Sequence, residues 1–203
     1  MRNLVFKGRK TNTVSAFGPR AMQTDTEFRT GVSNRQDAVE LFRSTFSAAE
    51  GESEGTLIST LVDTLFRTVK APDLRVYSAR TDGKLSGCIM FTPLVFDQDG
   101  RSAALLAPVA VRTDVQRHGI GQGLLKFGLD QVRQDGIDIA VTYGDPAYYC
   151  KVGFHPVTED DVPPPVSLSY PHGWLAQSLT GAPLSPLTGP SRTVDAFKDP
   201  SYW

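Results

Sequence analysis

The feature that most limits the possible folds is the apolar run at residues 102–111, S-A-A-L-L-A-P-V-A-V, which carries no charged side chain. A strand without polar alternation is typical of a sheet centre that is covered on both faces. After it come a glycine-rich turn, a helical apolar period over residues 120–132 and a second strand-like run at residues 137–143. This order predicts an α/β domain built around a strand, a turn, a helix and a strand.

The residues before this unit predict one more strand, two helices and a hairpin. Residues 26–32 have strand character, and apolar residues recur at helical spacing over residues 38–49 and 57–69. Residues 74–80 and 85–96 are strand-like runs that T-D-G-K separates, which is typical of an antiparallel hairpin.

Prolines and glycines mark two local features of the central unit. Pro108 removes one donor from the apolar strand, so we expect a bulge or a break in the ladder near it. After residue 143, Asp145 is a candidate N-cap and Pro146 suits a first helical position. We expect a short helix there that ends at Gly153.

The two ends of the chain differ in composition from its centre. Residues 1–22 are basic and lack a sustained apolar period, so we interpret them as an N-terminal extension. Residues 161–203 are rich in proline but carry too many aromatic side chains for a solvated segment, and we expect them to pack on the domain. We place the single domain between them, at residues 23–160, with little regular structure beyond it.

The overall charge argues against several classes of partner. The chain has 21 basic and 22 acidic side chains, which leaves no electrostatic footprint for nucleic acid or for a membrane surface. No apolar stretch approaches the roughly 18 residues of a membrane span, so we expect a cytoplasmic protein.

Cys88 and Cys150 are spaced for neither a zinc site nor a disulfide framework, and His155 and His172 lack metal-ligating neighbours. We therefore expect no metal.

Three glycines crowd the turn between the apolar strand and the next helix: Gly119, Gly121 and Gly123. Without a Cβ, such residues let backbone N–H groups approach a ligand closely at the helix end that favours an anion. A tight loop without a ligand has the same appearance. The spacing fits neither the dinucleotide-binding fingerprint nor the P-loop, which needs G-K-[ST] at its close. A pyrophosphate suits the turn.

The turn resembles the central signature [R/Q]-x-x-G-x-[G/A] of the GNAT acetyltransferase superfamily, with Gln116, Gly119 and Gly121 at its defining positions. Residues 148–154, Y-Y-C-K-V-G-F, look like the F-Y-x-x-x-G-F segment of the same superfamily. The flanking L-L-A-P-V-A-V and G-D-P-A-Y-Y sequences are most similar to its YhbS-like branch.

This resemblance implies an α/β (α+β) fold with a mixed, mostly antiparallel sheet that splays between strands four and five, with helices flanking it. It implies acetyl-CoA as cosubstrate, with the pantetheine arm paired to strand four and the pyrophosphate held by amides of the turn. The coenzyme site that it implies comprises Val109, Ala110, Val111, Gln116, Arg117, His118, Gly119, Ile120, Gly121 and Gln122.

The resemblance also implies a catalytic role for Tyr149, which matches the tyrosine that protonates the departing thiolate. With a reference pKa of about 10, a tyrosine is protonated at neutral pH and can donate. Packing aromatics on a short helix have the same sequence pattern, and we expect Tyr148 to be structural because neighbours on a helix face different directions. An amide of Val109 or Ala110, released by a bulge at Pro108, is a candidate donor to the oxyanion.

We therefore expect an N-acetyltransferase that moves an acetyl group to a primary amine of a small molecule or peptide by direct attack on the thioester. A protein N-terminal or lysine acetyltransferase stays open, as does a non-catalytic acyl-CoA-binding module. The general base is unassigned: Glu50, Glu52 and Glu54 are candidates, but an acidic loop is equally typical of a solvated surface. The acceptor is not readable, and a homodimer is one possibility for the oligomeric state.

Overall fold

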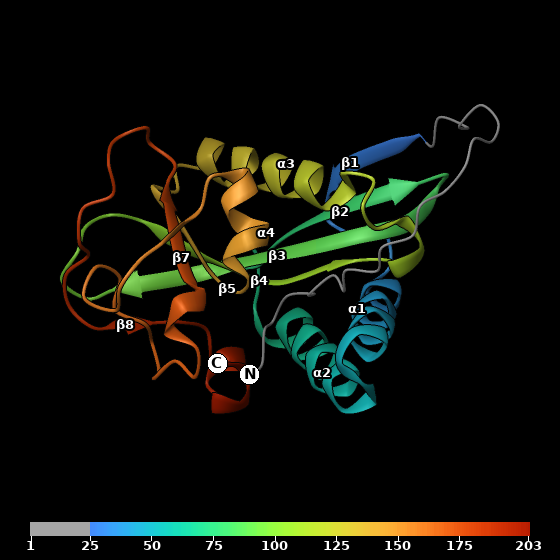
Figure 1. Ribbon diagram of the computed structural model, residues 1–203, viewed down its shortest axis with the longest axis horizontal. Coiled ribbons are helices and arrows are strands. Elements are labelled where there is room, and N and C mark those ends of the chain that lie inside the picture. The colour runs from blue at the N-terminus through green and yellow to red at the C-terminus, as the bar shows by residue number, and fades with distance from the viewer. Residues whose placement is uncertain (1–24) are drawn as a thin grey trace.

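A computed structural model describes residues 25–203 (Figure 1), so the predicted N-terminal extension at residues 1–22 lies outside the described residues. The strands are β1 (Thr26–Thr30), β2 (Arg75–Thr81), β3 (Lys84–Phe96), β4 (Ala103–Val111), β5 (Ile139–Tyr143), β6 (His155–Pro156), β7 (Trp174–Ser178) and β8 (Ser191–Arg192). The α-helices are α1 (Arg35–Glu50), α2 (Glu52–Thr68), α3 (Ile120–Gln134) and α4 (Pro146–Tyr149). Short 3-10 helices are η1 (Thr113–Val115), η2 (Cys150–Val152), η3 (Pro171–Gly173), η4 (Asp195–Phe197) and η5 (Pro200–Tyr202).

The strands form one sheet in the order β1-β2-β3-β4-β5-β7-β6, and β8 pairs with the end of β3. Neighbouring strands run antiparallel except for β4 and β5, which are parallel. Helices α3 and α4 lie on one side of the sheet, and α1 and α2 lie on the other (Figure 1). The predicted mixed, mostly antiparallel sheet with flanking helices is confirmed.

Strand β4 is the centre of the sheet, as its apolar run predicts. All nine of its residues are buried. Its register with β3 shifts between the pair Ile89 and Val109 and the pair Phe91 and Leu106, so that two β4 residues oppose one β3 residue. The extra residue lies beside Pro108, which confirms the predicted bulge.

The sequence provides a cap that begins α1 and a small residue that lets α2 pack closely on it. The Asn34 side chain accepts a hydrogen bond from the Gln36 N–H and begins α1. At Gly55 of α2, a Cβ would lie 2.0 Å from the Ser47 hydroxyl of α1, so only glycine permits this approach. Both predicted helices are confirmed.

The C-terminal part of the chain adds a strand that the sequence did not predict. Strand β7 lies between β5 and β6 in the sheet, with Trp174 opposite Tyr143. Its sequence, W-L-A-Q-S, contains few residues that favour strands, so local propensity gives no signal. The sheet therefore continues beyond residue 160, and the division of the chain into residues 23–160 and 161–203 stays a prediction about folding units.

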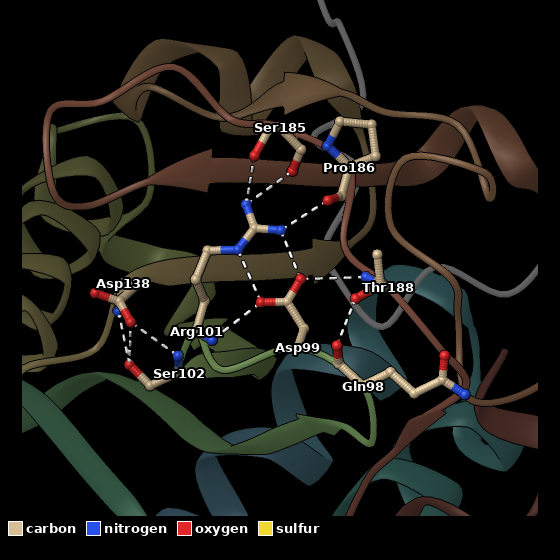
Figure 2. Close-up of polar contacts among 8 residues, drawn as sticks. All are labelled: Gln98, Asp99, Arg101, Ser102, Asp138, Ser185, Pro186 and Thr188. Carbon is tan, nitrogen blue, oxygen red and sulfur yellow. Dashed lines mark hydrogen bonds and ion pairs between the residues drawn. The ribbon is translucent and has the colours of Figure 1, made fainter.

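A polar cluster ties the tip of the β3–β4 hairpin to the C-terminal part of the chain, and Figure 2 shows its contacts. The Arg101 guanidinium donates to both carboxylate oxygens of Asp99 at 2.9 and 2.6 Å. It also donates to the backbone oxygens of Ser185 and Pro186 at 2.9 and 2.7 Å. Asp99 accepts from the Thr188 N–H at 3.2 Å. We call these five residues the Asp99–Arg101 clasp.

Candidate active site

The parallel strands β4 and β5 separate part-way along their length. Their ladder runs from the pair Ala103 and Ile139 to the pair Leu106 and Thr142. Beyond it, β5 ends and the chain turns into α4, whereas β4 continues to residue 111 alongside β3. At the fork, the Thr142 hydroxyl donates to the Leu106 carbonyl at 2.9 Å. The structure thus has the predicted splay, and one edge of residues 107–111 lacks a strand partner within the described part of the chain.

The register determines which backbone groups face this gap. The Arg112 N–H donates to the Ser86 carbonyl at 2.8 Å, so Arg112 bonds toward β3. Because bonding direction alternates along a strand, Ala110 also faces β3, while Val109 and Val111 face the gap. The Ala110 amide was expected to be among the groups that face a ligand, but the register directs that amide to β3.

The turn after β4 is held by the side chain of Gln116. Its Nε2 donates to the Val111 carbonyl at 2.8 Å, which closes the turn on the free edge of β4. Arg117 then adopts a φ of 66° and Gly119 a φ of 82°, both in the left-handed region. His118 is exposed, and its Nδ1 lies 3.4 Å from the Val115 carbonyl oxygen. Its side chain therefore faces away from the core.

Helix α3 begins at this turn with its first N–H groups exposed to a ligand. Gly119 is the N-cap and carries no side chain that could accept from them. The amides of Ile120, Gly121 and Gln122 have no acceptor within the helix, because the first turn of any helix leaves its donors unpaired. The helix dipole adds positive potential at the same place, so the turn suits an anion.

Tyr149 packs beneath this gap and is completely buried. It shares an apolar cluster with Val109 and Val111, and its ring lies 5.6 Å from that of Phe154. Its hydroxyl lies beside the Thr142 hydroxyl but does not have the geometry of a hydrogen bond to it or to another described residue. Burial raises the pKa of Tyr149 well above its ordinary value of 10.0, and the Thr142 hydroxyl nearby lowers that pKa only in part.

Tyr148 also lies at the gap, which the sequence analysis did not predict. Its ring is 5.3 Å from that of Tyr149 and packs against the same apolar cluster. A Cβ placed on Gly121 would lie 2.2 Å from the Tyr148 hydroxyl, so this hydroxyl reaches the first turn of α3. Helix α4 has only four residues and lies against the sheet, so two consecutive side chains both pack inward. No sequence signal distinguishes this from an outward-facing neighbour.

The acidic candidates for a general base lie elsewhere. Glu50 ends α1, and Glu52 begins α2 with 80% of its side chain exposed and an ion pair to Arg43. Glu54 is buried in α2. Because α1 and α2 cover the face of the sheet opposite Tyr149, the structure does not bring these carboxylates together with it.

The model of the acetyltransferase (GNAT) family matches residues 35–154, which is 120 of the 203 residues. The chain belongs to the GNAT acetyltransferase family. The match extends from the start of α1 to Phe154 and includes the free edge of β4, the glycine turn and both tyrosines. Family membership makes the protein an acetyltransferase.

Two curated relatives in this family are similar in sequence. The uncharacterized N-acetyltransferase YjhQ of Escherichia coli K12 is 34% identical over 122 residues, which cover 58% of this chain and 67% of YjhQ. The uncharacterized N-acetyltransferase YhbS of the same strain is 28% identical over 113 residues, which cover 56% of this chain and 65% of YhbS. The chain thus matches about two thirds of the length of these relatives.

Solved GNAT structures share the fold. The crystal structure of YhbS from Escherichia coli in complex with CoA has a TM-score of 0.75 at 21% identity, covering 89% of this chain and 96% of YhbS. A GNAT acetyltransferase from Brucella melitensis in complex with acetyl-CoA has a TM-score of 0.63 at 24% identity, covering 86% and 99%. The GNAT fold expected from the sequence motifs is confirmed.

Residues 25–203 contain no group of three or more His, Cys, Asp or Glu side chains placed to hold a metal ion. In that same range, no helix is both long enough and apolar enough to cross a membrane.

Proposed function

We propose that this GNAT acetyltransferase uses acetyl-CoA and transfers the acetyl group to a primary amine of a small molecule or peptide. The observation that carries the proposal is the free edge of β4 next to the uncapped first turn of α3. The backbone groups of Val109 and the N–H of Val111 suit the amide groups of a pantetheine arm, and the amides of residues 120–122 suit a pyrophosphate. The structural neighbours that bind CoA and acetyl-CoA support this choice of cosubstrate.

Direct transfer requires a neutral amine, an accessible thioester carbonyl and a proton for the leaving group. The amine nitrogen attacks the carbonyl carbon, a C–N bond forms, and the C–S bond breaks with its electron pair remaining on sulfur. The Tyr149 hydroxyl donates its proton to that thiolate, and the extra proton of the new amide passes to water, which returns a proton to Tyr149. The buried hydroxyl of Tyr149 fits this role, because no hydrogen bond of proper geometry fixes its proton among the described residues.

Burial affects both partners of this proton transfer. It raises the pKa of Tyr149 well above 10.0, which by itself makes the tyrosine a weaker acid. The same surroundings penalise a thiolate, whose ordinary pKa is about 8.5, because both anions lose hydration. The transfer therefore depends on the difference between the pKa values of the tyrosine and the thiol. Before the transfer, Tyr149 stays protonated throughout the neutral and mildly alkaline pH range.

The test of the proposal is release of free CoA thiol from acetyl-CoA in the presence of amines, amino acids, peptides and intact proteins. We expect thiol release that depends on an acceptor. Release only with protein lysines or N-termini would replace the small-molecule acceptor with a protein acceptor. Tight binding of acetyl-CoA without release for any acceptor would favour a non-catalytic acyl-CoA-binding module.

A substitution at Tyr149 tests the chemistry. Tyr149→Phe removes only a hydroxyl, so we expect it to preserve acetyl-CoA binding and to lower turnover at least tenfold, since general acid catalysis contributes about 100- to 10,000-fold. Tyr77→Phe is the matched control, because Tyr77 is also buried on this face of the sheet but contacts α3 at Gly128. Unchanged turnover in Tyr149→Phe would make Tyr149 a packing residue.

A further inference from the structure

We propose that the Tyr148 hydroxyl donates a hydrogen bond to the pyrophosphate of the coenzyme. Tyr148 then binds the coenzyme, whereas its neighbour Tyr149 serves the chemistry. This inference rests on the proposed use of acetyl-CoA and adds to it one side-chain donor beside the backbone amides of the turn.

The position of the hydroxyl is the first observation. Tyr148 extends from α4 across the gap to the first turn of α3, where its oxygen lies 2.2 Å from the point that a Cβ of Gly121 would occupy. A Val111 methyl carbon lies 3.3 Å from the same point, so strand β4, helix α3 and helix α4 meet there. The hydroxyl is thus adjacent to the unpaired amides of residues 120–122, where an anion is favoured.

The chemical state of the hydroxyl is the second observation. Burial is the sole cause that raises the pKa of Tyr148 to about 12, and no hydrogen bond or charge from the described residues contributes to it. The hydroxyl is therefore protonated at neutral pH and its proton is free to be donated. Tyr148 is only partly buried, so its hydroxyl can still be reached from the gap, and the oxygens of a phosphate are strong, charged acceptors for such a donor.

Gly121 completes the arrangement. Any side chain at this position would occupy the place of the Tyr148 hydroxyl, because even a Cβ would be too close to it. Because Gly121 has no side chain, both its own N–H and the Tyr148 hydroxyl can donate to a ligand at this place. The same glycine that belongs to the coenzyme signature also admits Tyr148.

Calorimetric titration of Tyr148→Phe with three thioesters separates a phosphate contact from a structural role. We expect the affinity for acetyl-CoA to fall by roughly tenfold or more, as loss of a hydrogen bond to a charged group predicts. The same loss is expected with 3′-dephospho-acetyl-CoA, which keeps the pyrophosphate. S-Acetylpantetheine lacks the pyrophosphate, so we expect its affinities for the variant and the wild type to agree within twofold. These affinities are measured by displacement.

Controls make each outcome decisive. Tyr77→Phe removes the hydroxyl of another buried tyrosine near α3, whose pKa is raised to about 12 by burial and by the Asp135 carboxylate, and we expect wild-type affinity for all three thioesters. Equal losses of affinity for acetyl-CoA and S-acetylpantetheine in Tyr148→Phe would overturn the inference, and so would wild-type affinity for acetyl-CoA. Failure of the wild type to bind acetyl-CoA would instead refute the proposed function itself.

Discussion

The two glycines at the start of α3 are required for different physical reasons. Gly119 has a φ of 82° and open space where a Cβ would be, so the requirement comes from its left-handed backbone. Gly121 has an ordinary backbone but meets the Tyr148 hydroxyl. The family signature has a small residue at both positions. Gly119 is required by its local backbone conformation, and Gly121 is required by a side chain from another helix.

Substitution of these glycines should separate the two causes. We expect Gly121→Ala to lower the free energy of unfolding by about 1–3 kcal/mol through overpacking. Tyr148→Phe should relieve most of this loss, because the next contacts of that Cβ are at 3.3 and 3.4 Å. Gly119→Ala should also lower the free energy of unfolding by about 1–3 kcal/mol, through backbone strain, and Tyr148→Phe should not reduce this loss. Urea denaturation of the single and double variants measures these free energies. If Gly121→Ala causes the same loss with and without Tyr148→Phe, the Tyr148 hydroxyl is not the reason for the glycine.

Among the elements, the β3–β4 hairpin depends on contacts that are remote in sequence. The Asp99–Arg101 clasp joins its tip to residues 185–188, and only 8% of the Asp99 side chain is exposed. A second pair, Asp97 with Arg192, lies on the same tip but is 39% and 65% exposed. The hairpin thus carries one shielded and one solvated ion pair, which permits a matched comparison.

The pH dependence of stability should identify the clasp. Hydrogen bonds from the Arg101 guanidinium hold the pKa of the Asp99 carboxyl well below its usual value of 3.8. Above the pKa that Asp99 has in the unfolded chain, its ionised carboxylate contributes its full stabilisation. This contribution is lost as the pH falls below about 5 toward the lower pKa that Asp99 has in the folded protein. We expect Asp99→Asn to lower the free energy of unfolding by about 1–3 kcal/mol at pH 7 and to weaken this acid dependence.

Asp97→Asn is the control for the clasp, since an exposed ion pair contributes at most about 1 kcal/mol. Both variants are compared with the wild type by urea denaturation at pH 7, 5 and 3.5. A larger effect of Asp97→Asn than of Asp99→Asn would show that the clasp does not stabilise the hairpin.

In the whole molecule, the C-terminal part of the chain and the first two helices share one core. Phe197, Tyr202 and Trp203 are buried in the same cluster as the inner faces of α1 and α2. Trp174 of β7 lies in this cluster too, with its ring 6.1 Å from that of Trp203. The last forty residues therefore supply apolar surface that the helices need, and we expect the described chain to unfold as one unit.

Truncation of Phe197 tests this cooperation. The side chain is fully buried against Tyr202 and Trp203, so we expect Phe197→Ala to lower the free energy of unfolding by about 3–5 kcal/mol. Tryptophan fluorescence reports on the C-terminal part, and far-UV circular dichroism reports mainly on the helices. The two unfolding curves should coincide in both proteins. Lys198→Ala at an exposed neighbouring position should change little, and separate transitions would indicate two folding units.

Much of the site was predictable because its requirements are local. Nine consecutive apolar residues fix β4 as a strand buried on both faces, since no polar face remains for solvent. Pro108 predicts the bulge because it lacks an N–H, and Gly119 predicts the turn because it tolerates a left-handed backbone. These properties belong to single residues and their neighbours, so the sequence by itself determines them.

The remaining features depend on contacts between distant segments. Strand β7 exists because β5 offers it an edge, although its own residues have weak strand propensity. The backbone direction of Ala110 follows from the register with β3, which a single strand cannot specify. Tyr148 faces the glycine turn because α4 is a single helical turn pressed against the sheet, so its hydroxyl meets a glycine 27 residues earlier. Only the tertiary structure decides these three, because each is set by the surface against which the residue packs.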